Sequence, residues 1–475
     1  MQRKKLHIKR NFAVYFLGLF SFYGHRTYAQ TTTSITLPQA NIQARTDYNT
    51  TINAGTYNSV ITLLPSFSVK STAANFTSTT SGSFPASLVH MKLSSIGSLV
   101  LLGLGTNNEV ALSTSGGVLY AAVASVASGA VTANARIATA SQTWTSGVFT
   151  DDVSFYTQGL LAGSISPASF TLSITIPGFI SPPSSIGTTN IAVNDLSFYR
   201  SANGISASQV IPVSSTVPYV PSIRSSSAQF SFSTTFANNA SPVSPVSTVS
   251  ASLSGVATAT SAILSTSDQT LTSAAGIAVP ANNSSSITHT YAISAAFLKS
   301  NFIQAGTYTA PLTYTWNKSS SATYPTTPVQ AQASGNLTIA VSDLGEIIAN
   351  QQSVNLPFTT TSNYVNGVST NMPTHIKLSK TTPYNLYVRA TSSSFTSGVN
   401  SIPLSVLRIG PMTGQTGVNT VTLSTTAQQL IQNADPVIDR TLDMQYSIPA
   451  SQTSNLFGKP AGTYITNIIY SFVAP

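Results

Sequence analysis

The chain has 475 residues and a formal net charge of +9, and its residues are 42% hydrophobic and 7% charged, with no cysteine. Charged residues make up roughly 25% of an average soluble domain, so this composition argues against surface ion-pair networks and against a highly charged disordered chain. The lack of cysteine excludes disulfide and thiolate chemistry. At roughly 150 residues per domain, the length predicts about three domains.

The first 29 residues predict a secretory signal peptide that is cleaved near Ala29. A basic segment up to Arg10 precedes an apolar run at 12–22 and then small residues, which is the order found in export signals. The apolar run is too short for the ~20 residues of a membrane span, so no span is expected in the mature chain. Removal of this segment leaves 14 basic and 11 acidic residues, a net charge of +3. Nucleic-acid binding through a basic patch is therefore not expected.

Two sequence elements recur together three times and predict homologous units. The first element, Leu-Ser-Thr-[Ser/Thr]-x-x-x-Leu, begins at Leu112, Leu264 and Leu423. The second element, [Ala/Ser]-Gly-[Thr/Val]-[Tyr/Phe], has its glycine at Gly147, Gly306 and Gly462. The predicted units span 30–165, 189–318 and 345–475, with Pro, Ser and Thr-rich linkers or long loops at 180–188 and 319–328.

Each glycine of the second element opens a predicted strand. Aromatic residues stand two and eight positions after the glycine, and even positions share one face of a strand. These aromatic residues are Phe149 and Phe155, Tyr308 and Tyr314, and Tyr464 and Tyr470. We therefore expect each unit to end in a half-buried strand, which forms a hairpin with the apolar strand just upstream.

The remaining pattern predicts an all-β fold. Alternating aromatic and β-branched residues, as in 229–233 and 384–389, are typical of strands, and 25 prolines interrupt the chain. Segment 344–352 is the one stretch where we expect one or two helical turns, between the second and third units. The fold class that fits is a tandem array of about three antiparallel β-sandwich (immunoglobulin-like) domains.

The repeated glycine element and the strand after it resemble the closing strand of bacterial surface β-sandwich domains, such as the spore-coat-U type and chaperone–usher pilins. Segment 384–390, with 395–398 and 402–404, is similar to the middle strands of such domains. Gly462 stands fourteen positions from the C-terminus, as in pilins, but Ala474 replaces the usual penultimate Tyr and no disulfide is present. The resemblance implies an immunoglobulin-like sandwich with a structural or adhesive role, and it does not establish assembly by a chaperone and usher.

Residues for catalysis or metal binding are sparse. The three histidines after the signal segment are His90, His289 and His375, and their separation leaves no local two-histidine metal motif. The sequence contains no Gly-x-Ser-x-Gly or Ser-x-x-Lys signature of a serine nucleophile. We expect no catalytic residue, no cofactor site and no metal site.

Paired carboxylates are the remaining route to hydrolysis, because glycosidases need two of them close together. The candidate groups are Asp151 with Asp152, Asp343 with Glu346, and Asp435 with Asp439 and Asp443. Adjacent residues of a strand point to opposite faces, so the first pair should not converge on one substrate. Pro436 and Arg440 favour a turn with a local ion pair for the third group.

A covalent Lys–Asn or Lys–Asp crosslink is a further option for surface sandwiches. Lys92 and Lys377 stand at matched sites, but the second unit has Arg224 there, which cannot form such a bond. Ordinary cations on strand edges are the better interpretation. Aromatic residues in loops, such as Phe198, Tyr199 and Tyr219, leave sugar or protein binding open.

The sequence thus predicts a secreted, non-catalytic protein of a bacterial surface or extracellular matrix, with a structural or adhesive, fimbrial-like function. Its expected partners are other surface proteins or glycans, and self-association is a further option. Two alternatives stay open. One is a secreted polysaccharide-binding or polysaccharide-hydrolysing protein that uses one of the carboxylate groups. The other is a pilin-like polymerising subunit, in which residues 30–50 take part in donor-strand assembly.

Overall fold

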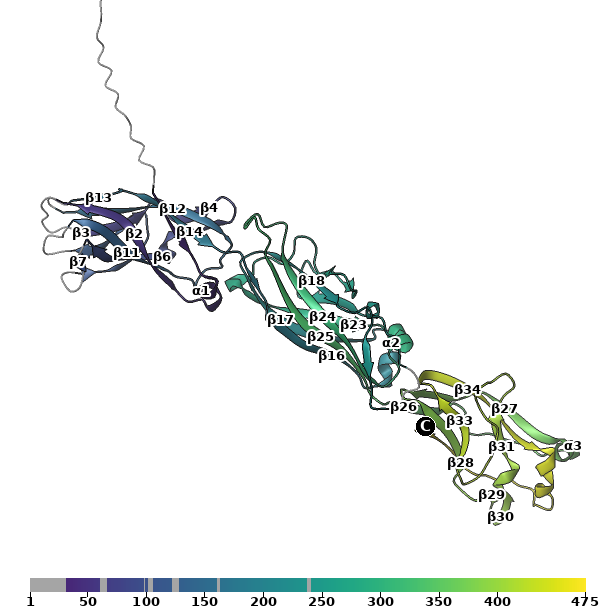
Figure 1. Ribbon diagram of the computed structural model, residues 1–475. Helices are drawn as coiled ribbons and strands as arrows, with labels where there is room; N and C mark the ends of the chain where they lie inside the picture. The colour runs from purple at the N-terminus through teal and green to yellow at the C-terminus, as the bar shows by residue number, and fades with distance from the viewer. Residues whose placement is uncertain are drawn as a thin grey trace, which may run out of the picture.

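Three β-rich bodies follow one another along the chain in the computed structural model (Figure 1). The structure describes residues 31–59, 66–97, 99–100, 106–121, 128–159, 163–236 and 241–475. The predicted signal peptide at 1–29 lies outside the described residues. Strands dominate the described part, which confirms the prediction of an all-β sandwich fold. We call the three bodies the first, second and third sandwich.

The first sandwich pairs two sheets. One sheet has the order β1 (Thr32–Thr36), β14 (Phe170–Ile176), β12 (Gly147–Gln158), β3 (Ser66–Ser71), β10 (Gly117–Ala121) and β8 (Thr106–Asn107), with the hairpin of β4 (Asn75–Ser78) and β5 (Gly82–Pro85) beside β12. The other has the order β13 (Ser164–Ser166), β2 (Tyr48–Asn58), β11 (Gly129–Ile137), β6 (Val89–Ile96) and β7 (Leu99–Val100), with β9 (Glu109–Ala111) on β6.

The second sandwich repeats this plan. One sheet has the order β16 (Ser185–Val193), β25 (Gln330–Val341), β24 (Gly306–Lys318), β18 (Tyr219–Ser225) and β22 (Gln269–Thr270), with β19 (Ser231–Ser233) on β24. The other has the order β15 (Ile180–Ser181), β17 (Ile205–Ser215), β23 (Ser284–Ile293), β20 (Ser250–Ser254) and β21 (Ala262–Ile263).

The third sandwich has one complete sheet and one short sheet. The complete sheet has the order β26 (Gly345–Ala349), β27 (Gly367–Lys380), β34 (Val437–Pro449), β31 (Arg408–Pro411) and β32 (Val421–Thr422). The short sheet has the order β33 (Gln428–Ala434), β28 (Tyr384–Ala390) and β35 (Ile468–Val473), and β29 (Ser394–Ser397) forms a separate hairpin with β30 (Asn400–Pro403).

Helices are short and lie in the connections between strands. The α-helices are α1 (Gln39–Ala44), α2 (Ala295–Asn301) and α3 (Thr361–Asn366). The 3₁₀ turns are η1 (Ala86–Leu88), η2 (Leu196–Tyr199), η3 (Val246–Thr248), η4 (Ala281–Asn283), η5 (Leu404–Val406) and η6 (Ala450–Leu456). Thr360 caps α3 through a capping box with Asn363, which satisfies amide groups that a helix start leaves open.

Each sandwich has its own hydrophobic core, and the third core is the smallest. Among the described residues, 32 buried apolar side chains form the first core, 32 form the second and 19 form the third. Partly buried apolar side chains show the reverse trend, with 3 around the first core and 15 around the third. The third core is therefore less well covered than the other two.

Several expected boundaries need correction. The predicted unit ends at 165 and 318 exclude β14 and β25, each of which is an integral strand of its sandwich. The predicted start of the second unit at 189 falls inside β16. Segment 319–328, which we expected to be a linker or a long loop, is the loop that connects β24 to β25 within the second sandwich. The error has one cause: the strand after the repeated glycine is not the last strand of the first two sandwiches.

Two local expectations were also wrong. The strand upstream of each glycine strand does not form a hairpin with it, because β11 and β12, β23 and β24, and β34 and β35 lie in opposite sheets. Segment 344–352 contains the strand β26 in place of helical turns. Its β-branched Ile347 and Ile348 pair with β27, and such residues suit a pleated sheet better than a helix.

Polar contacts join neighbouring sandwiches at two joints. At the first joint, the side chain of Asn283 accepts a hydrogen bond from the Trp144 amide at 2.8 Å and donates to the Ser215 carbonyl at 2.8 Å. Both Trp144 and Asn283 are almost fully buried. At the second joint, the Ala305 amide donates to the Thr381 carbonyl at 2.7 Å.

Candidate functional site

The glycine strands of the three sandwiches have different neighbours. β12 lies between β3 and β14, and β24 lies between β18 and β25. β35 pairs with β28 on one side, and no described strand pairs with its other side. The third sandwich therefore lacks, among the described residues, the strand that completes each of the other two. An edge strand of this kind presents unpaired backbone groups to a further strand.

Burial at the repeated positions follows this difference. In the first two sandwiches, the aromatic side chains after the glycine are covered, with exposed fractions of 2% for Phe149 and 0% for Tyr308. The matching Tyr464 is only partly buried, and so is Tyr470. The predicted positions Phe155 and Tyr314 are also buried, with exposed fractions of 2% and 1%. The same sequence pattern thus yields a closed core twice and an open one once.

Apolar side chains remain uncovered around β35. Ile465, Ile469 and Val473 are exposed, by 61%, 38% and 48%. Of the 14 exposed large hydrophobic side chains in the described chain, seven belong to the third sandwich. Those seven are Ile348, Val365, Val399, Phe457, Ile465, Ile469 and Val473. We call the unpaired side of β35, with the partly covered core behind it, the open edge.

A polar network fastens β35 to the opposite sheet. The hydroxyl groups of Tyr470 on β35 and Tyr446 on β34 share a hydrogen bond, and Tyr446 also bonds His375 Nε2 at 2.8 Å. The other ring nitrogen of His375 lies 3.0 Å from Gln351 Oε1. Burial raises the pKa of Tyr446 to about 12 and lowers the pKa of His375. The network attaches β35 to the opposite sheet and does not involve the open edge.

The carboxylate pair Asp151 and Asp152 has a structural role. Asp151 is buried and accepts hydrogen bonds from the amides of Ala73 at 3.1 Å and Asp152 at 2.8 Å. Asp152 accepts from the Thr171 hydroxyl at 2.8 Å. Burial is the main reason why the pKa of Asp151 is raised. Each carboxylate is held by its own local partners, and the two do not form a shared site.

The third carboxylate group differs from its expectation. Asp439 and Asp443 lie in β34, and Asp439 has a positive φ of 59°. Arg440, for which the sequence predicted a local ion pair with this group, donates a hydrogen bond to the Tyr384 hydroxyl at 3.3 Å. The three cations of Asp439 come from far along the chain: Arg200 at 2.9 Å, Lys299 at 3.1 Å and Lys377 at 3.0 Å.

Asp439 is the centre of an ionic cluster at the second joint. Arg200 of the second sandwich also pairs with Glu346 at 2.5 Å, and Lys380 pairs with Asp343. Although burial opposes ionisation, hydrogen bonds from the three cations lower the pKa of Asp439 to about 2. Asp343 and Glu346 thus have separate cations, and Lys377 serves this joint as an ordinary ion-pair donor.

The histidines lie in separate sandwiches. His90 is on β6, His289 on β23 and His375 on β27. No group of three His, Cys, Asp or Glu side chains that suits a metal ion occurs among the described residues. His289 is 1% exposed, neither of its ring nitrogens has a hydrogen-bond partner, and burial lowers its pKa to about 4.

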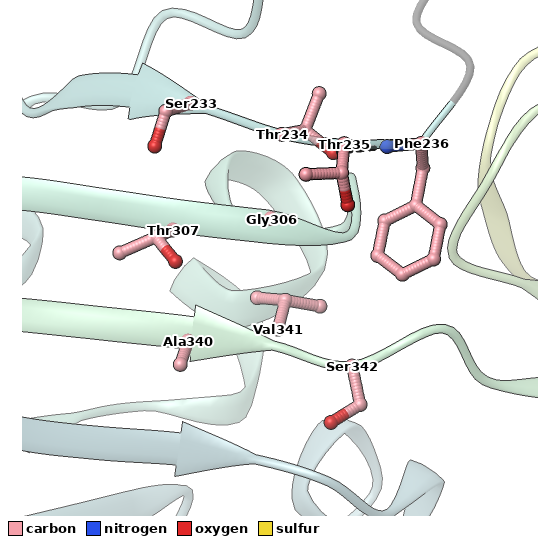
Figure 2. Close-up of a pocket in the computed structure, with 9 residues that line it drawn as sticks. All are labelled: Ser233, Thr234, Thr235, Phe236, Gly306, Thr307, Ala340, Val341 and Ser342. Atoms are coloured by element: carbon pink, nitrogen blue, oxygen red, sulfur yellow. Dashed lines mark hydrogen bonds between the residues drawn. The ribbon is translucent and has the colours of Figure 1, made fainter.

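A shallow pocket of about 310 Å³ lies where β19, β24 and β25 end near the second joint (Figure 2). Its lining consists of Ser233, Thr234, Thr235, Phe236, Gly306, Thr307, Ala340, Val341 and Ser342. Gly306 has a φ of 148°, and a Cβ there would lie 2.6 Å from the Ser233 carbonyl oxygen. The lining offers hydroxyl and apolar groups with no charged side chain, so it provides no acid, base or metal ligand.

Sequence reasoning missed the open edge and both joints. One signal for the edge is a strand motif, Leu-x-Ile-x-[Ile/Val], which occurs at 172–176 in β14 and at 337–341 in β25. The joints bring together residues far apart in sequence, such as Trp144 with Asn283, and no local pattern indicates such a contact. No helix of the described chain is long and apolar enough to cross a membrane.

No family model matches the chain, and no curated protein matches it either. The solved structures that match include the adhesive subunit CfaE of CFA/I fimbriae from enterotoxigenic Escherichia coli, with 12% identity, a TM-score of 0.30, and coverage of 66% of this chain and 98% of that one. CsuE, the tip adhesion subunit of the archaic chaperone–usher Csu pili of Acinetobacter baumannii, appears in a chaperone complex with 12% identity, a TM-score of 0.28, and coverage of 62% and 99%. The CupB6 tip adhesin of Pseudomonas aeruginosa matches with 9% identity, a TM-score of 0.23, and coverage of 62% and 98%. The chain is thus similar, at low identity, to fimbrial adhesin subunits with pilin-like β-sandwiches.

Proposed function

We propose that the chain is a non-catalytic surface protein of adhesive or structural type, and that a strand from outside the described residues completes its third sandwich. The observation that carries this proposal is the open edge of β35, at the position that β14 and β25 fill in the other sandwiches.

The two complete sandwiches indicate what the partner strand looks like. β14 runs antiparallel to β12 and places Ile174 opposite Phe149 and Leu172 opposite Asp151. β25 does the same on β24, with Ile339 opposite Tyr308 and Leu337 opposite Ala310. In the same register, a partner strand along segment 462–473, which ends in β35, places an isoleucine opposite Tyr464 and a leucine opposite Thr466.

The free energy available at the open edge is large enough for specific binding. Alternate side chains of a bound strand face the core, and each buried aliphatic side chain contributes roughly 1.5–3 kcal/mol. Backbone hydrogen bonds along β35 add affinity that depends little on sequence, while the side-chain pockets select the strand. Ordering the incoming strand opposes these gains.

The first strand of the described chain is already engaged. β1 pairs with β14 in parallel, and Ile35 and Leu37 are 4% and 0% exposed in the first core. Deleting residues 30–50 would therefore unfold part of the first sandwich and not merely remove a donor strand. We infer that the chain accepts a strand at the third sandwich and uses β1 for its own fold.

The absence of catalysis is also part of the proposal. What supports it is that Asp151, Asp152, Asp343, Glu346 and Asp439 each bind local or joint partners. Export through the signal at 1–29 is proposed with it. The three sandwiches follow one another in a row (Figure 1), so the first sandwich is held away from the open edge and is free for adhesion.

The test is binding of a synthetic peptide with the β25 sequence, residues 330–341, to the purified chain. At 100 times its dissociation constant, a bound peptide stabilises the third sandwich by about 2.7 kcal/mol, which calorimetry detects as a higher unfolding temperature for that body alone. A matched peptide with Leu337→Ser and Ile339→Ser should not bind. Equal effects of both peptides, or no effect of either, would contradict the proposal.

A further inference from the structure

A short motif, Ser-x-Thr-[Val/Thr]-Pro-Tyr, occurs at 214–219 and again at 379–384. Both copies begin at the end of a long strand, β17 in the second sandwich and β27 in the third. Their threonines, Thr216 and Thr381, are 1% and 0% exposed. Each threonine lies where the chain arrives from the preceding sandwich, and its hydrogen bonds connect the two bodies.

Thr216 joins the first two sandwiches through four hydrogen bonds. Its hydroxyl donates to the Pro177 carbonyl at 2.6 Å and accepts from the Phe179 amide at 3.1 Å. Its own amide donates to the Phe179 carbonyl at 3.2 Å. Its carbonyl accepts from the amide of Ser146, the residue before β12, at 2.9 Å. The threonine thus attaches the connection 177–179 and the start of β12 to the second sandwich.

Thr381 joins the second and third sandwiches in the same way. Its hydroxyl donates to the Ser342 carbonyl at 2.8 Å and accepts from the Leu344 amide at 2.7 Å. Its amide donates to the Leu344 carbonyl at 3.0 Å, and its carbonyl accepts from the amide of Ala305, the residue before β24, at 2.7 Å. The two joints therefore have the same backbone connections, so a difference in their stiffness comes from the side chains around the threonine.

Neutral groups surround the first joint. Asn283 bonds the amide and the carbonyl of Trp144 at 2.8 Å and 2.6 Å, and the two residues are 2% and 1% exposed. The Ser146 hydroxyl donates to the Tyr324 carbonyl, in loop 319–328 of the second sandwich, at 2.9 Å. Salt screens exposed charges and has little effect on buried neutral groups. We therefore expect the first joint to stay rigid when the ionic strength changes.

Ion pairs cross the second joint. Arg200 and Lys299 of the second sandwich lie 2.9 Å and 3.1 Å from Asp439 of the third. Arg200 also lies 2.5 Å from Glu346, and Lys377 adds a further cation 3.0 Å from Asp439. The side chains of these five residues are between 20% and 43% exposed. Water and dissolved salt therefore reach the ion pairs, and high ionic strength weakens them.

Contacts that do not depend on charge also cross the second joint. Leu344 and Ile438 are partly buried against the second core. These apolar contacts and the hydrogen bonds of Thr381 remain when the ion pairs are screened. Because the connection 342–344 between β25 and β26 is short, the third sandwich then turns about Thr381 and does not separate from the second.

We propose that the second joint is a hinge, which the ion pairs of Asp439 hold in the orientation that Figure 1 shows and which raised ionic strength releases, whereas the first joint is rigid. Loss of the ion pairs should raise the ratio of turned to unturned molecules about threefold to fivefold, as expected for a few partly exposed pairs. The direction of the third sandwich thus depends on the salt around the protein. The hinge needs no strand at the open edge, so it is independent of the proposed function.

The test measures one distance across each joint by pulsed electron paramagnetic resonance. The chain has no cysteine, so spin labels attach only to cysteines introduced at exposed positions. Thr150→Cys with Ser334→Cys spans the first joint, and Ser334→Cys with Ser401→Cys spans the second. From about 0.01 M to about 1 M salt, the Debye length falls from about 30 Å to about 3 Å. The distance distribution across the second joint should broaden over this range, and the distribution across the first should not.

Three variants test whether the ion pairs of Asp439 are the cause. Asp439→Asn should broaden the second distribution already in low salt, and salt should then change it less; asparagine accepts the positive φ of 59° at this position. Lys299→Gln on α2 should act in the same direction with a smaller effect, because it removes one pair. Asp268→Asn, which removes an ion pair with Arg224 inside the second sandwich, is the matched control and should change neither distribution.

The outcomes separate the hinge from the strand acceptor. Equal broadening across both joints, or a second distribution that neither 1 M salt nor Asp439→Asn changes, would overturn the hinge. An effect of Asp268→Asn as large as that of Asp439→Asn would do the same. These results leave the strand acceptor untouched, because binding of the β25 peptide measures it separately. Failure of that peptide to bind would contradict the proposed function and leave the hinge standing.

Discussion

All three sandwiches contain the repeated glycine element, but the strand that follows it differs: β12 and β24 begin at the glycine, as expected, whereas β35 begins at Ile468, six residues after Gly462. β12 and β24 have a neighbour on each side, and their inward side chains Phe149 and Tyr308 are covered. Among the described strands, β35 pairs with β28 alone, and Tyr464, which precedes β35, is only partly buried. A strand sequence thus specifies which face points inward, but a second strand must be present for that face to be buried. This difference is the basis of our proposal that a further strand binds beside β35.

The largest expected effect comes from truncating the repeated aromatic residue in a closed and in an open sandwich. Tyr308→Ala removes a fully buried side chain and should destabilise the second sandwich by about 3–5 kcal/mol, as measured by calorimetry. Tyr464→Ala should cost the third sandwich less than about 1.5 kcal/mol, because the side chain is only partly buried. Equal losses at both positions would show that the third core is as closed as the second.

The second expected effect is a pH dependence of the second sandwich. The folded-state pKa of His289 is about 4, below its ordinary value of 6.5, so its contribution is fully present above pH 6.5 and is lost as pH falls towards 4. This shift corresponds to about 3 kcal/mol. His289→Phe should flatten the dependence in urea titrations between pH 7 and pH 4. A variant that keeps the full slope would rule out His289 as its source.

A smaller effect separates the two joints. Asn283→Ala leaves the buried Trp144 amide without its partner. The free energy of unfolding should fall by about 1–3 kcal/mol, and added salt should not change this loss. Asp439→Asn at the partly exposed second joint should lower the free energy of unfolding by less than about 1 kcal/mol, and this loss should vanish in 1 M salt. Calorimetry at low and high salt measures both losses of stability. A salt-sensitive first joint would contradict this assignment.

How much of the structure the sequence predicts depends on how far apart in the chain the interacting residues lie. The inward positions of β12, β24 and β35 follow from local alternation, and the all-β class follows from the same pattern. The pairing of β14 with β1 depends on residues more than a hundred positions apart, and the joint contact of Arg200 with Asp439 spans 239 positions. Such contacts depend on how whole sheets pack together, and local patterns in one sequence do not predict this packing.

The smallest expected effect concerns the carboxylates that suggested hydrolysis. Asp152→Asn keeps an acceptor for the Thr171 hydroxyl, so stability should change by no more than about 0.5 kcal/mol. A polysaccharide hydrolysis screen of the wild-type chain and this variant should detect no turnover in either. Turnover that disappears on substitution would favour the polysaccharide-active alternative over a scaffold.

The central claim is that β35 has a free edge for a partner strand, and amide hydrogen exchange tests it most directly. In the free chain, the amides of β35 that point away from β28 should exchange much faster than the amides of β12 and β24, because an amide that donates to no neighbouring strand is not protected. Addition of the β25 peptide should slow exchange in β35 and leave β12 and β24 unchanged. Amides of β35 that are as protected as those of β12 and β24 without any peptide would contradict the account.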